Sequence, residues 1–195
     1  MTTFLLALLV GLTPGDDPPA APRSVVLDQG TQAKLREIAF QAAREGDVKT
    51  LAAYFEAGQP ADIVNARGDT LLILAAYHGH EDAVKTILAQ QKVVIDAKNK
   101  MGFTALTGSA YKGDLGIATQ LVAKGANPNA ANARGQTPLM YAAMFGRTDV
   151  VAFLVRSHAN LEAKDDQGRT ALMLAREQGS ADVVSLLAKG RGQTP

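Results

Sequence analysis

Residues 70–80 read TLLILAAYHGH, and three later segments repeat the pattern: TALTGSAYKGD at 104–114, TPLMYAAMFGR at 137–147 and TALMLAREQGS at 170–180. Successive segments begin 34, 33 and 33 residues apart. Each holds a threonine, then apolar and small residues, then a glycine nine positions after the threonine. An incomplete copy, IAFQAAREGD at 38–47, lies one period upstream. A fixed period of this length predicts an array of stacked units, here five.

Each unit is predicted to contain two short helices. The threonine hydroxyl can accept a backbone N–H at the start of the first helix, where proline is also tolerated, as in Thr137 followed by Pro138. The glycine ends that helix because it adopts the left-handed conformation at little cost. A second helix follows, with apolar pairs such as Val150 and Val151. An isolated helix needs about 12 to 15 residues to be even marginally stable in water, so each unit depends on stacking against its neighbours.

The connections between the units also repeat. Residues 61–69, 94–103, 128–136 and 161–169 are rich in Asn, Asp, Ala and Gly, which predicts hairpin-like fingers. The period, the segment TPLM at 137–140, the alanine pairs at 75–76 and 142–143 and GANPNA at 125–130 resemble ankyrin repeats over about residues 33–190. The segment GDTLLILAAYHGH at 68–80 looks like those of small exported bacterial ankyrin-repeat proteins. The resemblance implies an all-α solenoid of about five helix-turn-helix units with hairpin-like fingers.

The sequence predicts four segments: a signal peptide at 1–23, an N-terminal extension at 24–32, a repeat domain at 33–190 and a C-terminal tail at 191–195. The repeats cover about 33–64, 65–98, 99–131, 132–164 and 165–190. The first and last repeats carry many charged and polar residues, as the two ends of a self-contained stack require.

The sequence departs from the family pattern in three ways. The histidine of the TPLH motif, which usually forms a hydrogen bond between repeats, is replaced by Ile73, Thr107, Met140 and Met173. One residue is inserted around 90–94, which predicts a wider turn between the second and third repeats. The mid-turn glycine present at Gly58 and Gly125 is His158 in the fourth repeat.

The composition excludes several classes of function. The 195 residues are 47% hydrophobic, enough for one compact unit or two small ones. The chain has no cysteine, so it forms no disulfide, thiolate zinc site or cysteine nucleophile. Its net charge of +1 supplies no broad positive field for nucleic acid or an anionic membrane.

No pattern typical of a catalytic or metal site is present. His78 and His80 are two residues apart, which does not place them on one helical face, and His158 occupies a turn. The motifs HExxH and GxSxG are absent. The acidic residues Glu162, Asp165 and Asp166 are expected to cap and solubilise an exposed finger. We therefore expect no enzymatic activity, no cofactor and no metal.

The N-terminus has features of a secretory signal. The apolar run FLLALLVGL at 4–12 is too short to cross a bilayer, which takes about 20 helical residues, so no membrane-spanning segment is expected in the mature chain. The following TPGDDPPAAPRS at 13–24 offers small residues around Ala20 and Ala21 to a signal peptidase. We expect export to the periplasm or out of the cell. The alternative is a cytoplasmic protein with a misassigned start or an apolar tail.

The resemblance implies a module that binds another protein through a concave face lined by fingers and first helices, since the fold itself specifies no reaction. The contact positions of the family fall on the residues around each finger glycine and on the two residues before each helix-ending glycine. In this sequence they are Arg67, Asp69, Tyr77, His78, Met101, Phe103, Tyr111, Lys112, Arg134, Gln136, Met144, Phe145 and Arg169, with Gln167, Glu177 and Gln178 completing the last repeat.

Aromatic residues are concentrated at these positions. The chain has four tyrosines and six phenylalanines, and four of these ten are Tyr77, Phe103, Tyr111 and Phe145. Aromatic, Met and Arg side chains are enriched in interface cores, which makes these four and Met144 the expected anchors. Alternatively, the rings lie along the stack and cover helix ends. The apolar helix faces place three further phenylalanines in the core, namely Phe40, Phe55 and Phe153.

Two other functions remain open from the sequence. An enzyme or small-ligand-binding protein would have a pocket on the concave face with converging titratable groups of shifted pKa, whereas we expect a shallow apolar groove. A structural component of a homo-oligomer would associate with itself, whereas we expect a monomer when no partner is present. Light scattering at several concentrations distinguishes these last two states.

Overall fold

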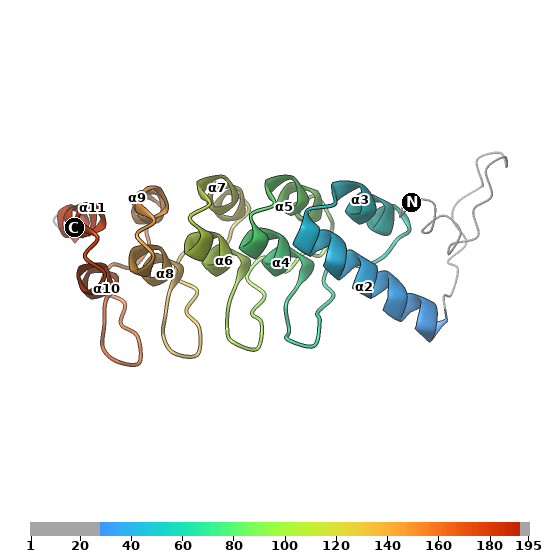
Figure 1. Cartoon of the computed structure of the whole chain (residues 1–195), viewed down its shortest axis with the longest axis horizontal. Helices are drawn as coiled ribbons and strands as arrows, with labels where there is room; N and C mark the ends of the chain where they lie inside the picture. The colour runs from blue at the N-terminus through green and yellow to red at the C-terminus, as the bar shows by residue number, and fades with distance from the viewer. Residues whose placement is uncertain (1–27, 192–195) are drawn as a thin grey trace.

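The computed structural model, which describes residues 28–191, is an elongated stack of helix pairs (Figure 1). The first helices form one row: α2 (Gln29–Glu45), α4 (Leu71–His78), α6 (Ala105–Lys112), α8 (Pro138–Met144) and α10 (Ala171–Glu177). The second helices form another: α3 (Val48–Glu56), α5 (Glu81–Leu88), α7 (Leu115–Ala123), α9 (Thr148–Arg156) and α11 (Ala181–Arg191). Each helix packs against its neighbours within its row and against the other helix of its pair. The described residues thus confirm an all-α solenoid of five helix pairs.

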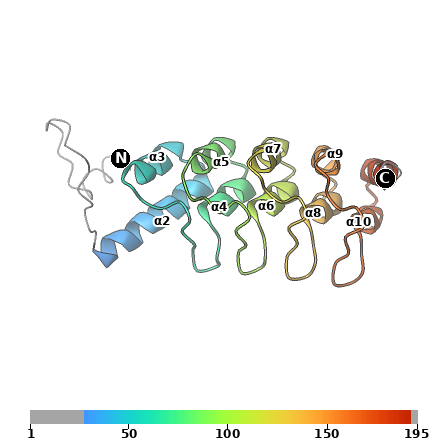
Figure 2. The same ribbon diagram turned by 180° about the vertical axis from the view of Figure 1, so that it is seen from behind.

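Four loops extend from one side of the stack, as both views show (Figure 2). They are the predicted fingers, and we number them finger 1 (residues 61–69), finger 2 (94–103), finger 3 (128–136) and finger 4 (161–169). An antiparallel bridge between Val64 and Thr70 closes the base of finger 1. Each finger leads into the first helix of the next repeat, so the fingers and these helices lie side by side along the length of the molecule.

Threonine begins each of the four first helices that follow a finger. The hydroxyl oxygens of Thr70, Thr104, Thr137 and Thr170 accept the amides of Ile73, Thr107, Met140 and Met173 at 3.1, 3.2, 3.3 and 3.4 Å. A glycine with positive φ follows each first helix, at Gly46, Gly79, Gly113, Gly146 and Gly179. Both predicted signals for the start and end of these helices are therefore confirmed.

Helix α2 is longer than the other first helices. It begins at Gln29, inside the segment 24–32 that the sequence assigned to an extension, and the Asp28 side chain accepts the Thr31 amide at 3.0 Å. Its buried residues lie only between Leu35 and Ala43, and its N-terminal end extends beyond the stack (Figure 1). At the other end, α11 reaches Arg191, the first residue of the predicted tail. The predicted signal peptide lies outside the described residues.

Alanine allows the first helices to approach one another. Ala75, Ala76, Ala142 and Ala143 are fully buried in a core that runs the length of the stack. Of the three phenylalanines expected in the core, Phe40 is buried, whereas Phe55 and Phe153 are only partly buried against it. Small buried side chains such as these let neighbouring helices pack closely.

The hydrogen bonds between repeats that a TPLH histidine usually makes come from other residues. His80 Nε2 donates to the Arg44 carbonyl at 2.7 Å, and Arg147 Nε donates to the Tyr111 carbonyl at 3.1 Å. Both donors directly follow a helix-ending glycine and reach back to the preceding repeat.

An Asn or Asp side chain closes the tip of each finger. Asn65, Asn99, Asn132 and Asp165 occupy the same position of the repeat, and each Oδ1 accepts the amides two and four residues later at 2.8 to 3.0 Å. This local bonding folds the finger back on itself. The sequence prediction for Asp165 was wrong in one respect: its side chain is buried rather than solvated, because it faces the Arg169 guanidinium at 2.8 Å.

Neighbouring fingers also bond to each other. Asn99 Nδ2 donates to Asp69 Oδ1 at 2.7 Å between fingers 1 and 2. A Cβ added to Gly68, Gly102 or Gly135 would lie 3.0 Å or less from atoms of the next finger, whereas one added to Gly168 would meet nothing within 4 Å. The first three finger glycines therefore permit close stacking, and the fourth lies at the open end of the stack.

The turn after each second helix needs a left-handed residue. Glycine supplies it at Gly58 and Gly125, with φ of 72° and 96°, but Lys92 and His158 adopt the same conformation at 61°. Three residues separate α5 from Lys92, whereas only Ala57 separates α3 from Gly58. The predicted wider turn between the second and third repeats is therefore confirmed. A left-handed residue with a Cβ is strained by about 1–2 kcal/mol.

We predict that His158→Gly stabilises the protein. Glycine removes the Cβ strain at φ 61°, and the exposed imidazole makes no hydrogen bond within residues 28–191 that the substitution would remove. The free energy of unfolding should rise by about 0.5–1 kcal/mol in urea titrations followed by circular dichroism. Gly125→Ala is the matched control and should lower it, since the added Cβ meets no atom within 4 Å and only the backbone is strained. A lower midpoint for His158→Gly would contradict this account.

We also predict that Asn99→Asp destabilises the protein at neutral pH. The substitution replaces the donor Nδ2 by an oxygen that would face the Asp69 carboxylate at a buried contact of 2.7 Å. The free energy of unfolding should fall by about 2 kcal/mol or more at pH 7. This decrease should shrink as the pH falls towards about 5, because the crowded pair takes up a proton more readily when folded than when unfolded.

Asn132→Asp is the control for this charge effect, because Asn132 Nδ2 faces the neutral Gln136 Oε1 and Tyr141 hydroxyl at 3.1 and 3.3 Å. Asn132→Asp should lower the free energy of unfolding less than Asn99→Asp does, and the decrease should depend less on pH. Equal costs with equal pH profiles would show that charge repulsion with Asp69 is not the cause.

Candidate functional site

Three rings form a continuous row across three repeats, which we call the aromatic row: Tyr77, Tyr111 and Phe145. The Tyr77 and Tyr111 rings are stacked with centroids 5.5 Å apart and planes 3° apart. The Phe145 ring meets Tyr111 edge to face at 4.6 Å. Tyr77 and Phe145 are each 41% exposed, and Tyr111 is half-buried. The rings therefore lie along the stack, as one interpretation of the sequence proposed, and still present apolar surface to solvent, as the other required.

The absence of a side chain at Gly108 helps to position two of these rings. A Cβ at Gly108 would lie 3.3 Å from both N and Cα of Tyr77, closer than an ordinary van der Waals contact. The same position is Leu74, Tyr141 and Leu174 in the other repeats. Helix α6 can thus approach α4 closely enough for Tyr111 to stack on Tyr77.

Phe103 does not join the aromatic row. Its ring packs edge to face against Tyr141 at 5.2 Å, and the Tyr141 hydroxyl donates to Gln136 Oε1 at 2.9 Å. Burial raises the pKa of Tyr141. Tyr141 was not among the residues predicted from the sequence to be functional. An aromatic residue four positions after the threonine, where other repeats have Leu or Gly, was the signal that could have found it.

Two of the predicted contact residues are not available to a partner. Asp69 and Gln136 are each only 7% exposed. Asp69 accepts hydrogen bonds from Asn65 Nδ2 at 3.1 Å and from Asn99 Nδ2, and Gln136 is bonded to Tyr141 and Asn132. Their prediction as contacts was wrong because the residue before the threonine points into the finger at these two repeats.

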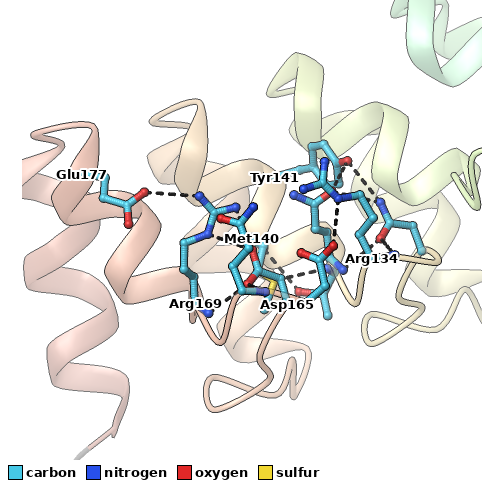
Figure 3. Close-up of polar contacts among 11 residues, drawn as sticks. Arg134, Met140, Tyr141, Asp165, Arg169 and Glu177 are labelled. Atoms are coloured by element: carbon cyan, nitrogen blue, oxygen red, sulfur yellow. Dashed lines mark hydrogen bonds and ion pairs between the residues drawn. The ribbon is translucent and has the colours of Figure 1, made fainter.

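Arg169 is engaged within the last repeat, as Figure 3 shows. Its guanidinium lies between Asp165 at 2.8 Å and Glu177 at 3.6 Å. Burial raises the pKa of Asp165, but hydrogen bonds from Arg169 and the Gln167 amide outweigh it and leave that pKa below its usual value. The hydrogen bond with Asp165 in turn raises the pKa of Arg169.

The ion pair between Arg169 and Glu177 also joins finger 4 to the end of α10. Glu177 occupies the position of Tyr77, Tyr111 and Met144 in the other repeats, and Arg169 is the residue before the threonine. An ion pair between the two positions means that the finger and the end of the first helix contribute to one surface.

The other predicted residues remain accessible. Met101 at the tip of finger 2 is 62% exposed, Met144 is partly buried, and the exposed remainder comprises Arg67, His78, Lys112 and Arg134. Burial lowers the pKa of His78, and the nearby His80, Lys112 and Arg44 lower it further.

Two hollows lie away from the aromatic row. One of about 380 Å³ is bordered by the N-terminal part of α2 and by finger 1, including Arg36, Glu37 and Val64. Another of about 150 Å³ lies between finger 1 and the turn that holds Val93 and Val94. Neither is lined by Tyr77, Tyr111 or Phe145. Across residues 28–191, His, Asp and Glu do not gather in groups of three that could hold a metal, and no helix has the length and apolar character needed to cross a membrane.

Comparisons with known proteins agree with this architecture. The family model for ankyrin repeats (3 copies) matches residues 39–132 and 106–194. The ankyrin repeat protein PA3287 of Pseudomonas aeruginosa is 41% identical over 59 residues, which cover 30% of this chain and 34% of that protein. Human ankyrin repeat and SOCS box protein 3 is 34% identical over 91 residues, 46% of this chain and 18% of that protein.

A further relative is alpha-latrocrustotoxin-Lt1a of Latrodectus tredecimguttatus, 38% identical over 64 residues, which cover 33% of this chain and 4% of the toxin. The chain therefore spans about a third or less of the length of these relatives. The family model covers most of the chain, and the threonine caps, fingers and stacked helix pairs follow its repeat pattern. The chain belongs to the ankyrin-repeat family.

Proposed function

We propose that this protein binds a partner protein through the surface formed by the finger tips and the ends of the first helices, with the aromatic row at its centre. Ankyrin repeats are protein–protein interaction modules, which supports the general function. The particular surface is supported by the arrangement of the described side chains.

The exposed aromatic row is the observation that carries the proposal. Seven large apolar residues are exposed in the described part of the chain, and Tyr77, Met101 and Phe145 are three of them. A fourth, Met173, lies in α10, the first helix of the last repeat. These Tyr, Phe and Met side chains, together with the exposed Arg67 and Arg134 of the fingers, match the composition of interface cores, where aromatic, Met and Arg side chains are enriched.

The rings are also well prepared for binding. Each ring is held by its neighbour, and Tyr77 and Tyr111 also belong to short helices, so little side-chain freedom remains to be lost in a complex. The stack carries them at successive repeats, which suits an extended segment or a helix face of the partner.

We propose that the protein acts without catalysis, as ankyrin-repeat proteins generally do. Three of the side chains with shifted pKa values lie in separate parts of the fold: Tyr54 in α3, Tyr141 in α8 and Asp165 in finger 4. Each is engaged by a neighbour in the fold. Tyr54, for example, donates to the Pro60 carbonyl, and burial raises its pKa to about 12. These groups hold the fold together rather than serving a reaction.

We predict that truncating the exposed rings weakens partner binding with little loss of stability. Affinity purification from the native compartment with mass spectrometry would identify the partner, and calorimetry would measure its affinity. Tyr77→Ala and Phe145→Ala should each weaken binding about tenfold or more. Leu115→Ala, which shortens an exposed apolar side chain on the row of second helices, is the matched control and should change nothing. Full affinity in a variant with Tyr77, Tyr111 and Phe145 all replaced by Ala would refute the proposed surface.

Export is a second proposal and rests on the sequence of residues 4–24. Expressed in a bacterium with its full N-terminus, the protein should be found in the periplasm or the medium and should begin near Arg23. Edman sequencing of the purified protein measures this start directly. A chain recovered from the cytoplasm with residues 1–20 intact would overturn the proposal.

A further inference from the structure

Neighbouring fingers bring together the same two positions of the repeat, which we call the slot, and the charges in the slot differ along the stack. Between fingers 3 and 4, the Asp166 amide donates to the Arg134 carbonyl at 2.8 Å. The two side chains then form an ion pair, with Arg134 Nε 3.1 Å from Asp166 Oδ2. The slot is formed by two residues on neighbouring fingers. One lies three positions before the threonine of its repeat, as Arg134 does before Thr137, and the other lies four positions before the threonine of the next repeat, as Asp166 does before Thr170.

Between fingers 1 and 2 the same slot holds two cations. Arg67 occupies the position of Arg134, and Lys100 that of Asp166. The backbone is the same, since the Lys100 amide donates to the Arg67 carbonyl at 3.0 Å. Both side chains are exposed, and neither has an ion-pair partner among residues 28–191. The geometry that pairs opposite charges at one end of the molecule therefore places like charges together at the other.

The neighbouring groups do not neutralise these two cations by direct contact. Asp69 is the closest acid along the chain, but it is buried and receives hydrogen bonds from Asn65 and Asn99. Lys98, also on finger 2, donates to the Ala131 carbonyl and adds a third positive charge. The exposed apolar groups nearest in the repeat pattern are Met101 on the same finger and Tyr77 at the end of the helix that finger 1 introduces.

We propose that a carboxylate side chain of the partner protein binds between Arg67 and Lys100, and that it contacts the Arg67 guanidinium as the Asp166 carboxylate contacts that of Arg134. This inference rests on the proposed function and narrows the partner to a protein that presents an acidic residue next to an apolar or aromatic one. The Arg134–Asp166 pair is the intramolecular counterpart of the contact, because it shows that a carboxylate in this slot reaches the guanidinium.

Charge complementarity is the physical basis. An arginine and a lysine side by side are unfavourable until an anion is placed between them, and a guanidinium offers a carboxylate two parallel donors. Such contacts at an exposed site contribute more to specificity and to the rate of association than to affinity. The contribution must also decrease as salt is added, since charges are screened over about 10 Å at 0.1 M ionic strength.

The test uses two peptides of fixed sequence, Glu-Glu-Phe-Glu-Glu and Gln-Gln-Phe-Gln-Gln, both with blocked ends. They are titrated into the 15N-labelled protein at low salt, and the backbone amide resonances are followed by NMR. The acidic peptide should bind about fivefold more tightly than the neutral one. The largest shifts that distinguish the two should fall at Arg67 and Lys100, whose backbone groups form the slot.

Two charge variants test the assignment. Lys100→Asp should fold normally, because it reproduces the Arg134–Asp166 pairing beside Arg67, and it should lose the preference for the acidic peptide. Asp166→Lys should gain a second site of acidic preference at Arg134. Thermal melts of both variants check that the fold is retained, which separates loss of the site from loss of the protein.

The outcomes separate this inference from the proposed function. Equal binding and equal shifts with both peptides, or an acidic preference that survives Lys100→Asp, would overturn the carboxylate site. Shifts at Tyr77, Tyr111 and Phe145 report on the aromatic row independently. A selective response at Arg67 and Lys100 without any at the rings supports the carboxylate site and counts against docking on the aromatic row.

Discussion

The structure depends on contact between neighbouring repeats. First helices of seven or eight residues after α2 cannot persist alone in water, so their stability comes from burying Ala- and Leu-rich faces against the next pair. Hydrogen bonds across repeats add to this, from His80 and Arg147 to preceding carbonyls and from Asn99 to Asp69. The finger glycines permit the same closeness, because a Cβ at Gly68, Gly102 or Gly135 would press on the next finger. Everything that positions the aromatic row follows from this stacking.

The fold could be predicted because its signals are local and repeated. A threonine cap and a left-handed glycine act within one turn of helix, and both recur with the period of the chain. The aromatic row could be predicted in part for the same reason, since Tyr77 and Tyr111 occupy one position of the repeat and Phe145 the next. Periodicity locates such positions without any knowledge of long-range contacts.

The parts that sequence reasoning missed are set by contacts between residues far apart in the chain or by the choice between two local partners. Asp69 is buried because Asn99, 30 residues away, donates to it. Gln136 is buried where its side chain accepts a hydrogen bond from the Tyr141 hydroxyl. Phe103 packs against the Tyr141 ring and so does not join the aromatic row. Asp165 is buried because Arg169 is there to compensate its charge. In each case the residue type fits either a surface or a buried role, and only the identity of the neighbour decides between them.

The central claim is that single repeats have no stability of their own and become a rigid binding surface only in the stack. The most direct test is the far-UV circular dichroism spectrum of the isolated repeat 99–131 beside that of the whole protein. The account predicts a largely unfolded peptide, whereas the whole chain should be helical and unfold cooperatively, since about three repeats are needed for stability. A helical peptide with its own cooperative melting transition would contradict it.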